Sequence, residues 1–243
     1  MQQTIREEAL MKRALVLNSG GLDSTTCLAL AIEQYGCNQV STLSIYYGQK
    51  HQKELECAKK IAAHYGIAHH ELDLSHIMAY DNSPLLSKSD QAIPQQSYGQ
   101  QLQEDKTGIV KTYVPFRNGL FLSAAAAIAM SLNREGETDL FLGAHADDAA
   151  GSAYADCTEE FTQTMGKAIE LGTYNKVHLI TPLVAMNKAQ VVKIGLQLAA
   201  PYQYTWSCYE GGDRPCGQCA TCLDRQRAFA AHNVTDPALI NPK

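Results

Sequence analysis

The sequence lacks the long apolar runs that mark membrane proteins and exported proteins. No apolar stretch reaches the roughly 18 residues that a transmembrane helix needs. Residues 1–12 are polar and carry both signs of charge, so they lack the apolar core of a secretory signal and are expected to form a flexible extension. We therefore predict a cytoplasmic protein with no membrane partner.

An excess of positive charge is also missing. The 243 residues include 20 Lys and Arg against 25 Asp and Glu, which gives a formal net charge of −5. Binding to nucleic-acid phosphates depends on clustered Lys and Arg, so we predict no nucleic-acid partner. The length and the 45% hydrophobic content are sufficient for one large α/β domain with a small appendage.

Two common phosphate-binding signatures, Gly-x-x-x-x-Gly-Lys-Ser/Thr and Gly-x-Gly-x-x-Gly, do not occur. The chain instead has Ser19-Gly-Gly-Leu-Asp-Ser24 between a predicted strand over residues 14–18 and a predicted helix over 24–35. The glycines let backbone N–H groups approach an anion, and the start of a helix favours negative charge. In a parallel sheet this turn lies at the ligand-binding edge. An ordinary capped turn is the alternative, but the position favours an ATP-phosphate loop.

The candidate nucleotide-binding residues run from the end of the strand into the first turns of the helix. Hydroxyl groups and backbone N–H groups in this segment can donate to phosphate oxygens. Asp23 carries the wrong charge for that role, so we expect it to bind a metal ion or to cap the helix. The predicted cofactor-binding residues are Asn18, Ser19, Gly20, Gly21, Leu22, Asp23, Ser24, Thr25, Thr26, Cys27 and Leu28.

Strand and helix patterns alternate along the chain, which predicts a parallel five-stranded sheet with helices on both faces. Residues 75–111 show no periodicity and are expected to be a functional or disordered loop. We predict a nucleotide-binding domain over 13–200 and a cysteine-centred C-terminal region over 201–243. The other predicted strands cover 40–46, 68–74, 139–144 and 177–180, and the other predicted helices cover 49–65, 118–133, 159–171 and 188–198.

Four of the eight cysteines lie close together, in a C-x7-C-x2-C-x2-C pattern. A disulfide framework is not expected without a secretion signal. Four thiolates suit a closed tetrahedral zinc site, and short C-x2-C turns present them in pairs. An iron–sulfur cluster is the main alternative, because it also accepts four cysteines. The predicted ligands of a structural zinc ion are Cys208, Cys216, Cys219 and Cys222.

Polar residues follow several other predicted strands. Arg117, in Val114-Pro-Phe-Arg-Asn118, could bind a carboxylate or a phosphate, while Asn118 could cap the following helix. Asp147, in His145-Ala-Asp-Asp148, could contact a metal ion or a substrate amine. Lys188 could neutralise pyrophosphate or lie on the solvent-exposed surface. The predicted catalytic residues are Asp23, Ser24, Arg117 and Asp147.

The six-residue loop resembles the PP-loop of ATP pyrophosphatases, which bind the β- and γ-phosphates of ATP and pass AMP to a substrate oxygen. Further segments extend the likeness over most of the chain, and together they resemble the QueC-type 7-cyano-7-deazaguanine (preQ0) synthases. These segments are Tyr47-Gly-Gln with His51, Val114-Pro-Phe-Arg-Asn118, Tyr154-Ala-Asp-Cys157 and the four-cysteine pattern.

This resemblance implies an adenine nucleotide alpha hydrolase-like fold and a ligase that forms C–N bonds. It implies the substrates 7-carboxy-7-deazaguanine, ammonia and ATP with Mg²⁺, a nitrile product for queuosine biosynthesis, one structural zinc ion and a homodimer. Family members read Tyr-Pro-Asp-Cys followed by Arg, whereas this chain has Ala155 and Thr158. The difference weakens the transfer of a substrate role to Asp156 and Cys157.

Three other functions fit parts of the sequence, and the first two are also PP-loop enzymes. Another PP-loop enzyme, such as a tRNA thiolase, would share the loop, but the net negative charge argues against an RNA-binding surface. A glutamine-dependent synthetase would need an added glutaminase domain, so free ammonia is expected. A zinc-stabilised binding module without catalysis would leave the phosphate loop without a purpose.

Overall fold

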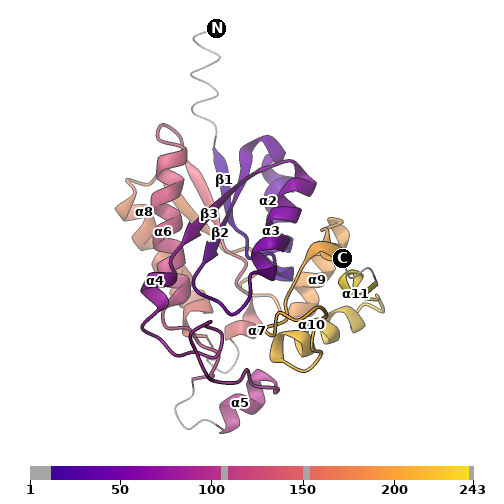
Figure 1. Cartoon of the computed structure of the whole chain (residues 1–243). Helices are drawn as coiled ribbons and strands as arrows, with labels where there is room; N and C mark the ends of the chain where they lie inside the picture. Colours follow the sequence, from indigo (N-terminus) through magenta and orange to yellow (C-terminus); the bar gives the residue numbers. More distant parts are fainter. Residues whose placement is uncertain (1–11, 105–108, 150–153, 241–243) are drawn as a thin grey trace.

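A five-stranded parallel sheet forms the centre of the computed structural model, which describes residues 12–104, 109–149 and 154–240 (Figure 1). The strand order β3-β2-β1-β4-β5 reverses direction between β1 and β4. Ligands of open α/β sheets bind at the carboxyl ends of the strands beside such a reversal. The strands are β1 (Arg13–Leu17), β2 (Val40–Tyr46), β3 (Ala68–Asp73), β4 (Thr138–Phe141) and β5 (Val177–Ile180).

Helices cover both faces of the sheet (Figure 1). One face is covered by α2 (Leu22–Tyr35), α3 (Lys53–Tyr65) and α9 (Lys188–Gln197), and the other by α6 (Arg117–Leu132) and α8 (Glu159–Gly172). This arrangement confirms the predicted fold class. The remaining elements are η1 (Cys37–Gln39), α4 (Ser75–Met78), α5 (Tyr98–Glu104), α7 (Ala146–Ala149), η3 (Ala155–Cys157), η4 (Tyr202–Tyr204), α10 (Ala220–Ala230) and α11 (Pro237–Ile240).

Side chains of β1 point alternately to the two faces of the sheet and so belong to two different halves of the core. Leu15 and Leu17 pack in the cluster that includes α6 and α8, whereas Ala14 and Val16 pack in the cluster that includes α2 and α9. Successive side chains of a strand point to opposite faces, so a strand buried on both sides reads as a continuous apolar run. This explains why residues 14–17 could be predicted as a buried first strand.

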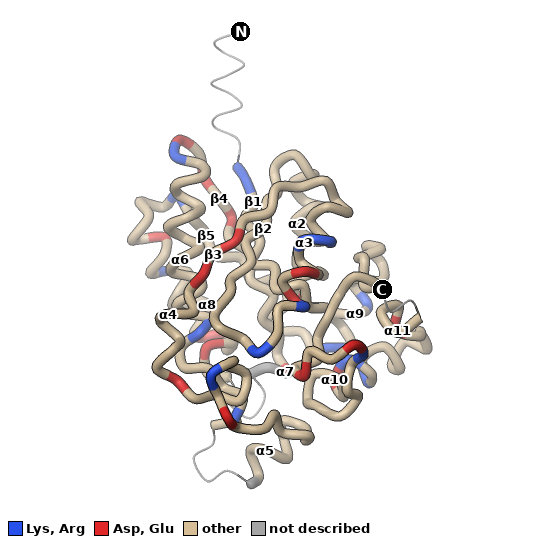
Figure 2. Tube along the Cα trace, viewed as in Figure 1, with Lys and Arg blue, Asp and Glu red and all other residues tan. Residues whose placement is uncertain are grey.

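The outer strand β3 is more polar than the central ones. Figure 2 shows acidic positions on this edge strand, and one of them, Glu71, lies 3.0 Å from the Lys59 ammonium of α3. Charged side chains on an edge discourage pairing with the edge of another sheet.

The C-terminal region packs against the same face as α2 and α9. Tyr202 and Phe229 are buried in the core cluster of α2, and their rings meet edge to face with centroids 5.5 Å apart. Arg225 of α10 holds the buried Asp236 carboxylate through two hydrogen bonds, at 2.6 and 2.8 Å. A domain boundary near residue 200 stays a prediction.

Several element boundaries differ from the predicted ones. The helix predicted from residue 49 begins at Lys53, because the Gln49 side chain accepts a hydrogen bond from the Tyr47 N–H and Gln49 bridges to Leu86. The described part of residues 75–111 is not a structureless loop: it contains α4 and α5, and it buries Leu86 and Ile93. The extension predicted over residues 1–12 lies outside the described residues except for Lys12. No helix in the described ranges is both long enough and apolar enough to cross a membrane.

Candidate active site

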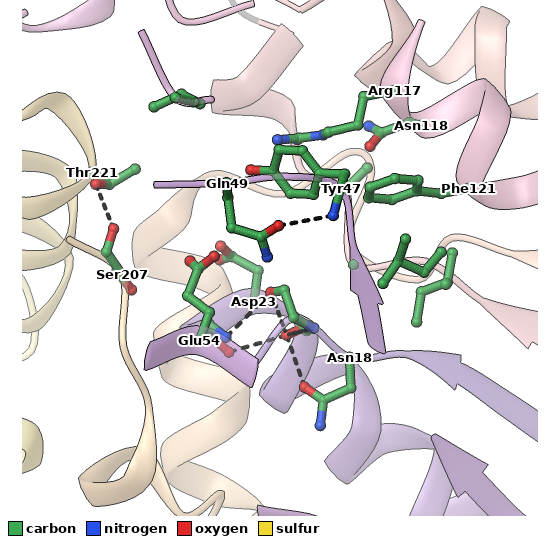
Figure 3. Close-up of a pocket in the computed structure, with 18 of the residues that line it drawn as sticks. Asn18, Asp23, Tyr47, Gln49, Glu54, Arg117, Asn118, Phe121, Ser207 and Thr221 are labelled. Carbon is green, nitrogen blue, oxygen red and sulfur yellow. Dashed lines mark hydrogen bonds between the residues drawn. The ribbon is translucent and has the colours of Figure 1, made fainter. Parts of the chain in front are cut away.

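A cavity of about 230 Å³ opens at the carboxyl ends of β1, β2 and β4 (Figure 3). Apolar side chains from the strand ends, including Leu17, Ile45 and Leu142, line part of it. Polar groups come from the phosphate loop, the start of α3, the start of α6 and the C-terminal region. An apolar cavity with a few converging polar groups is the usual form of a small-molecule site.

The phosphate loop at one end of the cavity is held by hydrogen bonds within itself. The Asn18 Oδ1 atom accepts from the Gly20 N–H at 2.9 Å and from the Ser24 hydroxyl at 3.1 Å. The Ser19 N–H lies 3.2 Å from Ser24 Oγ. Gly20 has φ +81°, and a Cβ atom there would lie 2.1 Å from the Glu54 carbonyl oxygen. The loop is therefore pressed against the first turn of α3, and only glycine fits at position 20.

Asp23 forms a charged cluster with Lys188 and His145. The Lys188 Nζ atom lies 2.5 Å from Asp23 Oδ2 and 3.0 Å from His145 Nε2. Burial raises the pKa of the Asp23 carboxyl, but the Lys188 ammonium and His145 outweigh that effect and hold the pKa below its usual value. The Lys188 side chain is only 12% exposed and lines the cavity, so the alternative of a solvent-exposed lysine is wrong. A lysine beside a phosphate loop is a common partner of phosphate groups.

Arg117 lies on the opposite wall of the cavity, against two aromatic rings (Figure 3). Its guanidinium carbon is 5.5 Å from the centre of the Tyr47 ring and 5.9 Å from that of Phe121. Cation–π contacts of this kind fix the guanidinium plane. The group is thereby held in position to receive an anionic ligand.

The Val-Pro-Phe-Arg-Asn and Tyr-Ala-Asp-Cys segments meet at the start of α6. The Asp156 carboxylate accepts a hydrogen bond from the Asn118 N–H at 2.8 Å, and the Asn118 side chain donates to Cys157 Sγ at 3.1 Å. The expectation that Asn118 caps the helix is wrong, because α6 begins one residue earlier and the carboxylate that satisfies its first turn is Asp156. Thr158, one of the two departures from the family pattern, caps α8 by accepting from the Phe161 N–H.

Three tyrosines from distant segments meet at this end of the cavity. The hydroxyls of Tyr98 and Tyr209 lie 2.7 Å apart, and the Tyr154 hydroxyl lies 2.7 Å from Thr112 Oγ1 and 3.5 Å from the Tyr209 hydroxyl. Neither Tyr98 nor Tyr209 belongs to a sequence motif, so neither could be predicted as a site residue. Burial and hydrogen bonding at this wall favour binding of a flat, polar ring.

Six of the predicted cofactor-binding residues and Arg117 line the cavity. Asp147 does not appear among the lining residues: its carboxylate accepts a hydrogen bond from the Lys188 N–H at 2.6 Å. Gly20 contributes to the turn without lining the cavity. The remaining predicted residues of α2 are buried in the core, and one of them, Thr26, lies 2.6 Å from the Tyr202 hydroxyl. Those core residues are Thr25, Thr26, Cys27 and Leu28.

The four clustered cysteines could hold a metal ion. Their Sγ atoms all lie within 4.8 Å of one another, and tetrahedral zinc with bonds of about 2.3 Å requires sulfur atoms about 3.8 Å apart. Hydrogen bonds from the Cys208 and Cys222 thiols lower the pKa of Cys219 far below its usual range. The cluster adjoins the cavity, since Ser207, Tyr209 and Thr221 line the cavity and the Thr221 hydroxyl donates to the Ser207 carbonyl at 2.7 Å (Figure 3).

The family model described as "Queuosine biosynthesis protein QueC" matches residues 13–233. The chain belongs to the QueC family. Among the relatives of this chain, the 7-cyano-7-deazaguanine synthase of Archaeoglobus fulgidus is 39% identical over 228 residues, covering 93% of this chain and 90% of the relative. The enzyme of the same name from Caldicellulosiruptor saccharolyticus is 41% identical over 226 residues, covering 93% and 94%.

A solved structure with a similar fold is the NMN synthetase of Francisella tularensis. The matched region covers 96% of this chain and 82% of the synthetase chain, with a TM-score of 0.50 and 14% sequence identity. At that identity the likeness concerns the fold alone. It agrees with the α/β fold of this chain.

Proposed function

We propose that this chain is a ligase that converts 7-carboxy-7-deazaguanine and ammonia to 7-cyano-7-deazaguanine at the expense of ATP, in queuosine biosynthesis. One observation carries the proposal: in a member of the QueC family, a single cavity has a phosphate loop with Lys188 at one end and the guanidinium of Arg117 at the other. The name shared by the relatives supports the same reaction. A tRNA thiolase is not favoured, because none of these relatives is named as one.

The loop end of the cavity would bind ATP. Backbone N–H groups of residues 19–24 and the Lys188 ammonium would hold the β- and γ-phosphates, as expected for a loop that opens a helix. Asp23 would fix the Lys188 ammonium by the contact of 2.5 Å and could share Mg²⁺ with ATP, since carboxylates and phosphates are its usual ligands. The Ser24 hydroxyl, bonded to Asn18, would keep the loop in its binding shape.

The opposite end would bind the heterocyclic acid. Arg117 would orient the substrate carboxylate towards the α-phosphate of ATP, because a guanidinium matches a carboxylate with two hydrogen bonds. The flat ring would lie against Phe121, Tyr154 and Tyr209, which line this end. Asp147 holds the start of α9, so its role would be to position Lys188.

A carboxylate and an amide are both poor electrophiles, so the reaction needs two activation steps. Transfer of AMP from ATP to a carboxylate oxygen releases pyrophosphate and gives an acyl adenylate, from which ammonia displaces AMP to leave an amide. A second transfer of AMP to the amide oxygen lets that oxygen leave with AMP while the nitrogen loses its protons, and the nitrile forms. The protein's part is to position the reactants and to stabilise charge on the phosphates.

We further propose that the four cysteines bind one structural zinc ion, which would hold the segment of residues 207–221 against the cavity. Four thiolates leave no open position on zinc, so the ion would take no part in the reaction. The wider proposals follow the resemblance: a cytoplasmic homodimer that binds its small-molecule substrates without nucleic acid, and a division into residues 13–200 and 201–243.

An endpoint assay tests the function. Zinc-loaded protein is incubated with ATP, magnesium, ammonium and 7-carboxy-7-deazaguanine, and AMP and the heterocyclic products are measured by mass. We expect the nitrile to appear with AMP and pyrophosphate. AMP without amide or nitrile would point to another acid as substrate, and absence of ATP cleavage by folded, metal-loaded protein would refute the proposal.

A further inference from the structure

One acidic side chain of the cavity accepts no hydrogen bond from the residues that the structure describes. Glu54 lies in the first turn of α3, lines the cavity and is partly buried. Figure 3 shows its carboxylate in the same cavity as Asp23 and Gln49. Asp23 is compensated by Lys188, but the described residues provide no hydrogen bond to the Glu54 carboxylate, and Arg117 is the one charge that acts on it appreciably.

The backbone places Glu54 beside the phosphate loop. Gly20 and the Glu54 carbonyl are so close that a Cβ atom at position 20 would overlap that oxygen. The side chain therefore starts directly next to the loop, and it lines the same cavity as Arg117, whose charge acts on it. A group at this place lies between the site proposed for the ATP phosphates and the site proposed for the substrate carboxylate.

We propose that Glu54 binds the ammonium ion and accepts a proton from it, delivering ammonia to the acyl adenylate. This inference rests on the proposed function, in which ammonia is a substrate. At neutral pH most ammonia is protonated and has no lone pair for attack, so an enzyme that uses it needs a proton acceptor near the acyl carbon. A partly buried carboxylate without a partner attracts a small cation.

Ammonium passes one proton to the Glu54 carboxylate, which frees the lone pair of the nitrogen. The lone pair forms a C–N bond at the acyl carbon while the bond from that carbon to the AMP oxygen breaks. AMP leaves with the electron pair. Glu54 gives the first proton to water and can take the second proton that the new amide nitrogen loses.

The ionisation of Glu54 fits this task. Burial raises the pKa of its carboxyl to about 7, while the Arg117 guanidinium opposes the rise. A base is most effective when its pKa lies near the working pH. Besides Arg117, the other charged or titratable residues that line the cavity are Asp23, Tyr47, Lys50, His51, Tyr98, Tyr154, Cys157, Lys188 and Tyr209.

The test compares wild type with Glu54→Gln, which keeps the shape and removes the base. Glu56→Gln is the matched control, because Glu56 lies in the same helix and is exposed. We measure pyrophosphate formation in a single turnover of ATP and the acid without ammonium, kcat/KM for ammonium, and kcat/KM for hydroxylamine, which is largely unprotonated at neutral pH. For Glu54→Gln we expect pyrophosphate formation within about twofold of wild type, a loss of about 100-fold with ammonium, and a much smaller loss with hydroxylamine.

The pH profile provides a second measurement. In wild type, kcat/KM for total ammonium should rise with pH up to about 7 and then level off, because the Glu54 base is then ionised and ammonium is still its main substrate form. In Glu54→Gln it should keep rising until ammonium itself loses its proton. Equal losses with ammonium and hydroxylamine, a loss of pyrophosphate formation, or an unchanged variant would each overturn the inference. Failure of wild type to form pyrophosphate from ATP with the acid would instead refute the proposed function.

Discussion

The two ends of the cavity reach their shape by different routes. At the end that we propose binds the ATP phosphates, called the phosphate end, residues 18–24 belong to one strand–loop–helix unit and bond mainly to one another. At the end that we propose binds the substrate acid, called the acid end, Tyr98, Tyr154 and Tyr209 come from segments more than 50 residues apart and meet through their hydroxyls. Short-range bonds preorganise the first end locally, whereas the second depends on the packing of the whole chain. Substitutions at the two ends should therefore change different kinetic constants.

The largest effect is expected from Asp23→Ala at the phosphate end. Loss of the Asp23 carboxylate removes the ion pair of 2.5 Å with the Lys188 ammonium. It also removes a candidate magnesium ligand. We expect turnover to fall about 1,000-fold, as when a charge-stabilising group is lost, with an unchanged melting temperature. Steady-state kinetics and thermal unfolding measure this, and near-normal turnover would remove Asp23 from the site.

Cys219→Ser should act at the acid end. Loss of one ligand should release zinc and loosen the segment that carries Ser207 and Tyr209, since metal binding and folding are coupled. We expect substoichiometric zinc by elemental analysis, a lower melting temperature, and a KM for the acid that rises more than the KM for ATP. A variant with full zinc would refute the ligand assignment.

Gly20→Ala tests the close contact between the loop and α3. The backbone there has φ +81°, and the new methyl group would meet the Glu54 carbonyl oxygen. We expect a loss of about 1–3 kcal/mol in the free energy of unfolding from the backbone strain, together with weaker ATP binding. Gly36→Ala is a matched control, because Gly36 also has a positive φ, at +73°, but has open space around it. Equal losses in the two variants would show that the contact with α3 adds nothing.

The smallest effect is expected from Tyr98→Phe, which removes one hydrogen bond to Tyr209 and keeps the ring. A net loss of about 1 kcal/mol corresponds to about a fivefold rise in KM for the acid. The KM for ATP should stay unchanged. An equal rise in both constants would mean that the two ends are not separate sites.

The sequence was sufficient for the fold and for the phosphate end. Buried strands such as β1 are continuous apolar runs, and the loop residues are adjacent in the chain, so their geometry follows from local pattern. Glu54 and Tyr209 could not be found in this way, because their proximity is set by how α3 and the C-terminal region pack on the sheet. Gln49 shows the same limit. Its side chain accepts a hydrogen bond from the Tyr47 N–H, and the helix begins four residues after the start that the pattern predicts.

The proposed reaction transfers AMP to oxygens of the substrate. To test this transfer, 7-carboxy-7-deazaguanine with both carboxylate oxygens replaced by ¹⁸O is used as the substrate, and the AMP is analysed by mass spectrometry. We expect one heavy oxygen in the AMP released as the amide forms and one in the AMP released as the nitrile forms, with none in pyrophosphate. Heavy oxygen in pyrophosphate or in water, with unlabelled AMP, would contradict adenylation of the substrate.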